Sequence, residues 1–112
     1  MNAYLDCNAT TPIEPEVREL VLRFMSDEFG NAGSRTHDFG ARAKRAVQQA
    51  RDQVAAVVGA ERDEVLFTSG GTESNNHAIR GVALARRGHG KHIITSQIEH
   101  PAVTGVCERL KQ

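Results

Sequence analysis

The sequence contains no tryptophan, one tyrosine and four phenylalanines, so aromatic residues make up only 4% of its 112 residues. Any hydrophobic core must therefore be built from alanine and aliphatic side chains. The length allows one domain at most, or one piece of a larger domain. An excess of charge is also lacking, because fourteen basic and fourteen acidic residues cancel. This balance argues against the basic surface of a nucleic-acid-binding protein.

Long hydrophobic runs are absent as well, and none of the apolar stretches could span a bilayer. Residues 1–6 lack both the charged and the apolar region of a signal peptide. We therefore expect a cytoplasmic protein without membrane contacts, in which Cys7 and Cys107 are reduced thiols. Cys107 falls in an expected helix and is interpreted as a small buried hydrophobic residue rather than a nucleophile. The basic residues within 42–51 are typical of a solvated helix face.

Hydrophobic periodicity and breaker residues predict four helices and two strands. The helices are expected at about 14–29, 39–58, 73–87 and 101–111, and the strands at about 64–68 and 92–95. Residues 1–13 are expected to form an irregular arm. Because a strand, a helix and a second strand alternate, the pattern favours a parallel α/β sheet. Ligands of such sheets bind at the carboxyl ends of the strands.

Several boundary residues support this assignment of helices. Asp38 is predicted to cap the second helix, and Pro101 suits the first turn of the last one. Glycine is the usual residue just past the end of a helix. The expected ends are marked by Gly30, Gly59 and Gly88.

The most informative segment is residues 67–76, with the sequence FTSGGTESNN. Gly70 and Gly71 lie between an expected strand and an expected helix, where backbone N–H groups can converge at the positive end of the helix dipole. Hydroxyl groups of Ser69 and Thr72 would add donors, so the turn is a candidate phosphate cradle. An ordinary loop with glycines at positive φ and Thr72 as N-cap explains the same pattern. The segment has neither the lysine of a P-loop nor a G-x-G-x-x-G motif.

His100 follows the second expected strand, just as the Gly70–Thr72 turn follows the first. Their shared location at the carboxyl ends of strands supports one ligand site. The alternative interpretation of His100 is a capping or surface residue. The remaining histidines have no metal-ligand spacing with cysteines or carboxylates, so no zinc site is predicted. They are His37, His77, His89 and His92.

Four segments resemble, in this order and spacing, the N-terminal part of the cysteine desulfurases, which are pyridoxal-phosphate enzymes of the class V aminotransferase group. The segments are residues 4–12 (YLDCNATTP), 29–37 (FGNAGSRTH), 67–76 (FTSGGTESNN) and 90–103 (GKHIITSQIEHPAV). The resemblance covers essentially the whole chain. Within the family, Asp6-Cys7-Asn8 and residues 30–34 look most like the branch that serves DNA phosphorothioation.

The resemblance implies the fold-type I transferase architecture, three α/β/α layers around a mixed sheet, of which residues 14–112 would be the N-terminal part of the large domain. It implies pyridoxal 5′-phosphate as cofactor. Gly71 and Thr72 would hold the cofactor phosphate, His100 would stack on its ring and assist proton transfer, and Asn8 would approach the substrate.

The implied reaction moves sulfur from L-cysteine to an enzyme cysteine and leaves alanine. The sulfur serves iron–sulfur cluster assembly, thio-cofactors or DNA modification. In the family this work is done by a homodimer together with a sulfur-acceptor protein. No direct contact with nucleic acid is implied.

The sequence departs from the family pattern in what it does not contain. The family's cofactor-anchoring lysine, the aspartate facing the pyridine nitrogen, the persulfide-forming cysteine and the arginine for the substrate carboxylate would all lie beyond residue 112. Lys91, Lys111 and Cys107 do not match those motifs, and Cys7 stands where relatives often carry another residue. The two strands are not neighbours in the family's sheet, so their edges would be unpaired.

We therefore expect a fragment that is inactive alone. The alternatives are a non-catalytic module that binds a phosphate ligand and an interaction fragment whose first two helices pair with a partner.

Overall fold

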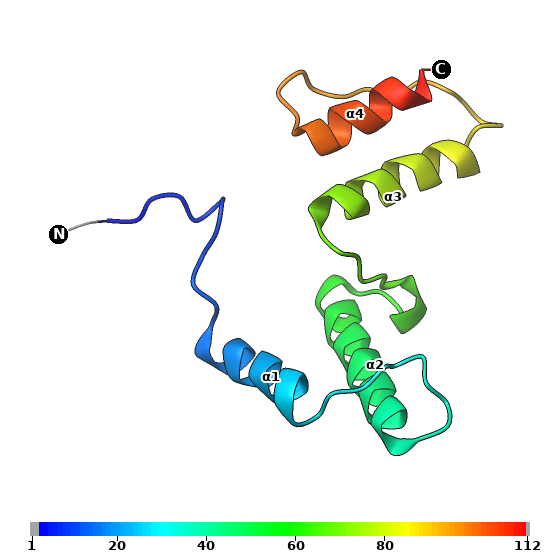
Figure 1. The fold of residues 1–112 in the computed structure, drawn as a ribbon. Coiled ribbons are helices and arrows are strands. Elements are labelled where there is room, and N and C mark those ends of the chain that lie inside the picture. The colour runs from blue at the N-terminus through cyan, green and yellow to red at the C-terminus, as the bar shows by residue number, and fades with distance from the viewer. Residues whose placement is uncertain (1–2, 112) are drawn as a thin grey trace. The chain divides into compact units, whose positions relative to one another are not determined.

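The computed structural model describes residues 3–111, which fall into two compact units that divide between Val65 and Leu66. The first unit contains α1 (Pro15–Ser26), α2 (Asp38–Val58) and the short 3-10 helix η1 (Arg62–Glu64), and the second contains α3 (Gly71–Ala85) and α4 (Pro101–Leu110) (Figure 1). None of the described helices is long and apolar enough to cross a membrane.

Residues 3–13 form an irregular arm, closed by Tyr4. The Tyr4 hydroxyl lies 3.0 Å from the carbonyl oxygens of both Asp6 and Thr10 and ties the arm into a turn. α1 then begins with Pro15, whose fixed φ suits a first helical position. It ends at Ser26, before the expected residue 29, and buries none of its residues.

The N-cap of α2 is His37, not Asp38. His37 has an extended backbone, and its Nδ1 accepts a hydrogen bond of 3.2 Å from the N–H of Gly40. Asp38 therefore becomes the first helical residue, where its negative charge still suits the helix dipole. Gly59 ends the helix with φ of 67°, as predicted, because glycine adopts the left-handed conformation without strain.

The other two glycines expected to end helices do not do so, since α1 is capped by Asp27 and α3 by Arg86. At Gly30 the reason for glycine is close packing. A Cβ there would lie 2.5 Å from the carbonyl oxygen of Phe39.

η1 folds back against α2 through one ion pair. Arg62 donates two hydrogen bonds to the Asp52 carboxylate, at 2.5 and 2.7 Å. The Arg62 hydrogen bond holds the pKa of Asp52 below its ordinary value. Because both side chains are about half exposed, the pair orients η1 more than it stabilises the unit.

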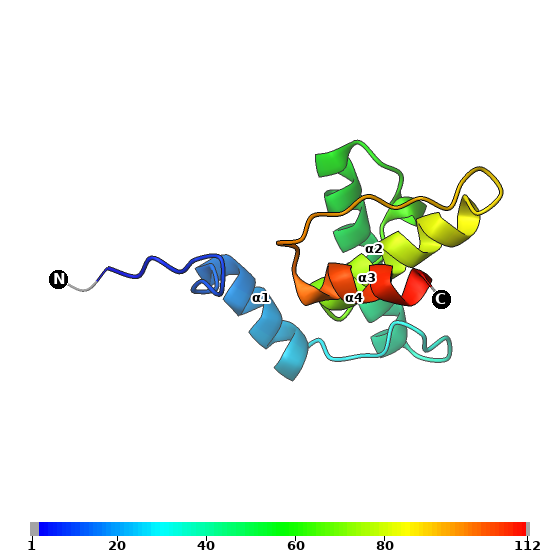
Figure 2. The same ribbon diagram turned by 90° about the horizontal axis from the view of Figure 1, so that it is seen from above.

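In the second unit α3 and α4 run in the same direction, and residues 86–100 return between their ends (Figures 1 and 2). The two helices pack on each other, with Ala102 and Val106 of α4 only 7% and 2% exposed. This parallel arrangement brings the N-terminus of α3 and the N-terminus of α4 to the same end of the unit.

The predicted strands at 64–68 and 92–95 are wrong for the described residues, none of which is in a strand. Glu64 belongs to η1 instead, and Val65 has the extended backbone of a strand, with φ −95° and ψ 117°. Extended residues become a strand only when the N–H and C=O groups of a neighbour pair with them. Residues 65–68 and 92–95 are not assigned to strands, so the expected parallel sheet is not formed among residues 3–111.

The core is small. The buried apolar residues among those described are Ala43, Ala55, Ala102 and Val106. The valines of the second half of α2 are largely exposed, with Val54 42% and Val57 86% accessible. Apolar surface of this extent is typical of faces that another segment or protein covers.

Candidate functional site

The N-terminus of α3 has no side-chain cap. Its N-cap is Gly70, whose φ of 160° is ordinary extended backbone. Thr72 is the second residue of the helix, so the interpretation of Thr72 as an N-cap is wrong. Within residues 3–111 the left-handed conformation occurs at Gly59 and not at Gly70 or Gly71. The two glycines are therefore not required by their backbone conformation.

Several hydrogen-bond donors in the first turn of α3 have no partner among the described residues. The first amide bonded into the helix is that of Ser74, whose N–H lies 3.1 Å from the Gly70 carbonyl oxygen. The N–H groups of Gly71 and Thr72 and the Thr72 hydroxyl donate to no other described residue. A Cβ at either Gly70 or Gly71 would meet no atom within 4 Å. Open backbone, free donors and the positive end of the dipole suit an anion.

Ser69 does not contribute a free donor, contrary to the prediction. The Glu73 carboxylate accepts from the Ser69 backbone N–H at 2.6 Å and from the Ser69 hydroxyl at 2.7 Å. These two bonds, and to a lesser degree the charge of His77, lower the pKa of Glu73. The Ser69 donors therefore bind the Glu73 carboxylate, whereas the N–H groups of Gly71 and Thr72 remain available to a ligand.

His100 is the N-cap of α4. Its Nδ1 accepts a hydrogen bond of 3.1 Å from the N–H of Ala102, so the capping interpretation is confirmed for this nitrogen. An accepting Nδ1 places the ring proton of a neutral imidazole on Nε2. Within the described residues Nε2 has no hydrogen-bond partner. His100 can therefore cap the helix with one nitrogen and meet a ligand with the other.

The turn and His100 face one concave surface, here called the N-terminal hollow. Its volume is about 640 Å³, within the range of small-molecule sites. It is lined by Ser69, Thr72, Glu73, Asn76, His100, Pro101, Ala102, Gly105, Val106 and Arg109. The structure thus joins two motifs that lie 28 residues apart in the sequence. Glu73, Asn76 and Arg109 were not predicted, although Asn76 follows Thr72 by one helical turn.

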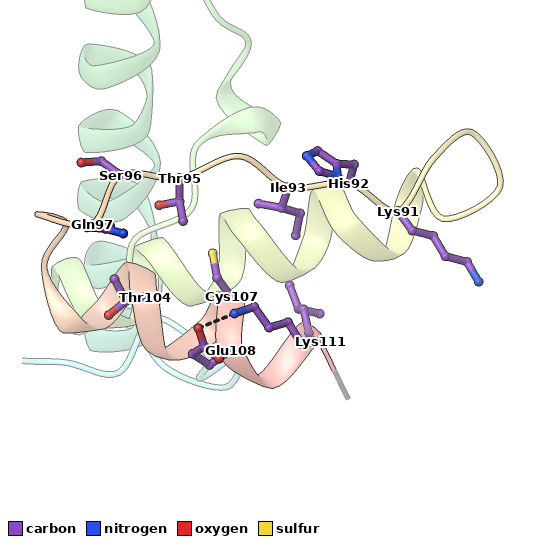
Figure 3. Close-up of a pocket in the computed structure, with 11 residues that line it drawn as sticks. Lys91, His92, Ile93, Thr95, Ser96, Gln97, Thr104, Cys107, Glu108 and Lys111 are labelled. Atoms are coloured by element: carbon purple, nitrogen blue, oxygen red, sulfur yellow. Dashed lines mark hydrogen bonds and ion pairs between the residues drawn. The ribbon is translucent and has the colours of Figure 1, made fainter.

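A second hollow of about 590 Å³ lies between α4 and the returning segment. In Figure 3 the Cys107 sulfur points toward the chain that carries Ile93 and Thr95. Cys107 is a free, half-buried thiol, less buried than expected. Nearby, the Lys111 ammonium pairs with the Glu108 carboxylate at 2.6 Å (Figure 3). None of the predicted site residues lines this hollow.

Asn8 lies in the first unit, exposed in the turn that Tyr4 closes, and its role stays a prediction. Among the described residues no three His, Cys, Asp or Glu side chains gather as metal ligands.

Comparisons with known proteins add a second line of argument. Residues 3–112 match the family described as aminotransferase class-V. The chain is 50% identical over 109 residues to the cysteine desulfurase IscS of Dictyoglomus turgidum, covering 97% of this chain and 27% of that protein. It is also 50% identical over 111 residues to the cysteine desulfurase IscS of Escherichia coli K12, covering 97% of this chain and 28% of that protein.

Two solved structures share the backbone arrangement. A NifS-like protein superposes with a TM-score of 0.87 at 37% identity, over 99% of this chain and 30% of that one. A structure titled "SspA in complex with cysteine" superposes with a TM-score of 0.85 at 39% identity, over 98% of this chain and 31% of that one. The chain therefore spans less than a third of each of these relatives.

Proposed function

The chain belongs to the aminotransferase class-V family, and we propose that it forms the N-terminal part of a pyridoxal-phosphate-dependent cysteine desulfurase. Relatives that are half identical to it carry the name cysteine desulfurase. Solved structures of NifS-like type support the corresponding place in a fold-type I transferase.

The observation that carries the proposal is the N-terminal hollow, where the open turn of α3 and the ring of His100 line one surface. The N–H groups of Gly71 and Thr72 and the Thr72 hydroxyl would hold the cofactor phosphate. His100 would stack on the cofactor ring, with Nδ1 engaged by Ala102 and Nε2 left to hold or move a proton. Pyridoxal 5′-phosphate, when bound, supplies the electron sink of the reaction. Asn8 would approach the substrate side.

The Glu73 carboxylate and the proposed phosphate would use different hydrogen-bond donors of the turn. Glu73 also lines the N-terminal hollow. Its carboxylate would repel the phosphate if both anions were bound by the same N–H and hydroxyl groups. The two Ser69 donors already bind Glu73, at 2.6 and 2.7 Å. Ser69 is accordingly left out of the proposed phosphate contacts, and Gly71 and Thr72 carry them.

In the proposed reaction the C–S bond of L-cysteine breaks, the sulfur passes to an enzyme cysteine as a persulfide, and alanine leaves. By the resemblance to the family, the groups that would anchor the cofactor and accept the sulfur are expected beyond residue 112. Covalent catalysis needs those groups themselves, so the chain alone should be inactive. The whole protein would act as a homodimer with a sulfur-acceptor protein. Its sulfur would serve iron–sulfur clusters, thio-cofactors or DNA phosphorothioation.

Sequencing the gene beyond codon 112 is the first test. We expect an in-frame lysine, aspartate and cysteine in the family's context. A stop codon directly after Gln112 would overturn the desulfurase proposal and leave the phosphate-binding module as the better interpretation.

Turnover is the second test. The 112-residue chain with added pyridoxal phosphate should release no sulfide or alanine from L-cysteine above the free-cofactor background, whereas the full-length protein should release both. Turnover by the short chain that Cys7→Ser or Cys107→Ser abolishes would contradict the assignment of the missing groups.

A further inference from the structure

Hydrogen bonds through Asn76 and Ala102 link the first turn of α3, here called the phosphate turn, to His100. The Asn76 side-chain nitrogen donates to the Thr72 carbonyl oxygen at 2.9 Å and to the Ala102 carbonyl oxygen at 3.4 Å. The Ala102 N–H in turn donates to His100 Nδ1 at 3.1 Å. All four residues line the N-terminal hollow.

Within the described residues, the bond from Asn76 to Ala102 is the one hydrogen bond between α3 and α4. The contact between these helices also includes apolar packing, and Val106 of α4 is 2% exposed. The hydrophobic effect is non-directional, so it does not by itself decide which polar groups at the helix ends face one another. The bond from Asn76 adds a directed contact at the N-terminal ends of the two helices.

We propose that Asn76 is a positioning residue that sets the distance between the phosphate turn and the His100 ring. This inference rests on the proposed function. Asn76 acts through Ala102: its amide holds the carbonyl of the same residue whose N–H holds the imidazole. Both amide hydrogens are donated to carbonyl oxygens, so Asn76 supplies no donor to a ligand.

The neighbouring Asn75 provides a matched control. It has the same side chain, lies on the same helix and is also half-buried. It does not line the N-terminal hollow and makes no side-chain hydrogen bond to another described residue. Asn76→Asp keeps the shape but faces both carbonyls with a carboxylate, whereas Asn75→Asp adds the same charge without breaking the path.

The first experiment needs no cofactor. Hydrogen–deuterium exchange is followed by mass spectrometry in the cofactor-free protein, on peptides that contain the start of α4. Asn76→Asp should raise the exchange rate of the Ala102 amide by roughly fivefold, which corresponds to the loss of one ordinary hydrogen bond. Asn75→Asp should leave this rate unchanged. Equal exchange in the two variants would overturn the proposal.

The second experiment is a double-mutant cycle in the cofactor-loaded full-length protein. Asn76→Ala should lower kcat by roughly fivefold and change the visible circular dichroism of the bound cofactor, with less than about a twofold change in cofactor affinity. In a His100→Ala background, Asn76→Ala should alter kcat less than about twofold. Asn75→Ala should leave kcat unchanged in both the parent and the His100→Ala background. Additive effects of Asn76→Ala and His100→Ala would refute action through His100.

The two experiments separate this inference from the proposed function. If Asn76→Asp changes exchange at Ala102 but the full-length protein binds no pyridoxal phosphate, the proposed function fails and the tie between the helices stands. If the cofactor binds and the Asn76 variants behave like the Asn75 variants, the proposed function stands and the positioning role fails.

Discussion

Helices α2 and α3 both begin beside glycines, yet their first turns are completed in different ways. At α2 a side chain caps the helix: His37 accepts a hydrogen bond from the Gly40 N–H, and a Cβ at Gly40 would lie 2.5 Å from the Ser34 carbonyl oxygen. At α3 no side chain caps the helix, and Gly70 and Gly71 face open space. Glycine is required for packing at α2, whereas at α3 no contact among residues 3–111 explains the two glycines.

The difference shows how to distinguish a structural glycine turn from a ligand-binding one. A structural turn has a side-chain cap, and its glycines are packed against neighbouring atoms. A turn prepared for an anion leaves N–H groups unpaired and its backbone accessible. The aromatic stack of Phe29 on Phe39, with ring centroids 5.3 Å apart, further closes the first turn.

The largest expected effect comes from removing a donor at the open turn. Thr72→Val keeps the shape of the side chain and deletes the hydroxyl. Because a hydrogen bond to a charged group contributes about 1.5–3 kcal/mol, cofactor affinity of the full-length protein should fall by roughly ten- to a hundredfold. Absorbance titration with pyridoxal phosphate measures this.

Thr104→Val is the matched control, since Thr104 is a threonine of α4 that lines the other hollow, and it should bind cofactor normally. His100→Ala should instead disturb the cofactor absorbance and slow turnover, with a smaller loss of affinity. If Thr72→Val retains the parent affinity, the open turn does not hold the phosphate.

Adding one methyl group to each turn tests the packing difference directly. Gly40→Ala places a Cβ 2.5 Å from one Ser34 atom and 2.7 Å from another, and such overpacking should cost about 1–3 kcal/mol of the free energy of unfolding. Gly71→Ala meets empty space and should be neutral, or stabilise the helix by up to about 1 kcal/mol. Urea unfolding of the cofactor-free protein compares the two. A similar loss in the free energy of unfolding for Gly40→Ala and Gly71→Ala would contradict the packing difference between the two turns.

A smaller effect on stability is expected from removing the N-cap of α2. His37→Ala leaves the Gly40 N–H without its acceptor, and loss of an N-cap costs about 1 kcal/mol. The variant should unfold at lower urea concentration but bind pyridoxal phosphate like the parent. A drop in cofactor affinity larger than the drop in stability would mean that the first turn of α2 also serves the ligand.

The smallest expected effect is the pH response of the internal carboxylate. Bonds from Ser69 lower the pKa of Glu73 below its ordinary value of 4.5, so the folded state binds fewer protons than the unfolded one in this range. The contribution of Glu73 to stability is complete above pH 4.5 and is lost as the pH falls through the lowered value. Glu73→Gln should flatten this acid limb of the stability profile. Parallel profiles for parent and variant would show that the contact with Ser69 does not matter.

Helices were predicted within a few residues of their observed bounds because their signals are local. Pro15 and Pro101 start α1 and α4, and Gly59 ends α2. The strands could not be predicted in the same way. Residues 65–68 have strand composition, but strand formation depends on neighbours, and none of the described residues is in a strand.

At the candidate site, the motif marked Gly71, Thr72 and His100 as a possible group, and the structure places Thr72 and His100 on one hollow. The role of Ser69 was misjudged because Glu73, four residues later, captures both of its donors. That pairing depends on how the turn enters the helix.

By itself, the sequence determined the family and the positions of the helices, because motif spacing, proline and glycine act through neighbours along the chain. Only the tertiary structure decided that α3 and α4 run side by side in the same direction, that Asn76 bridges them, and which turn donors remain open. These depend on contacts between residues far apart in the chain, where small differences in packing and hydrogen bonding select one arrangement.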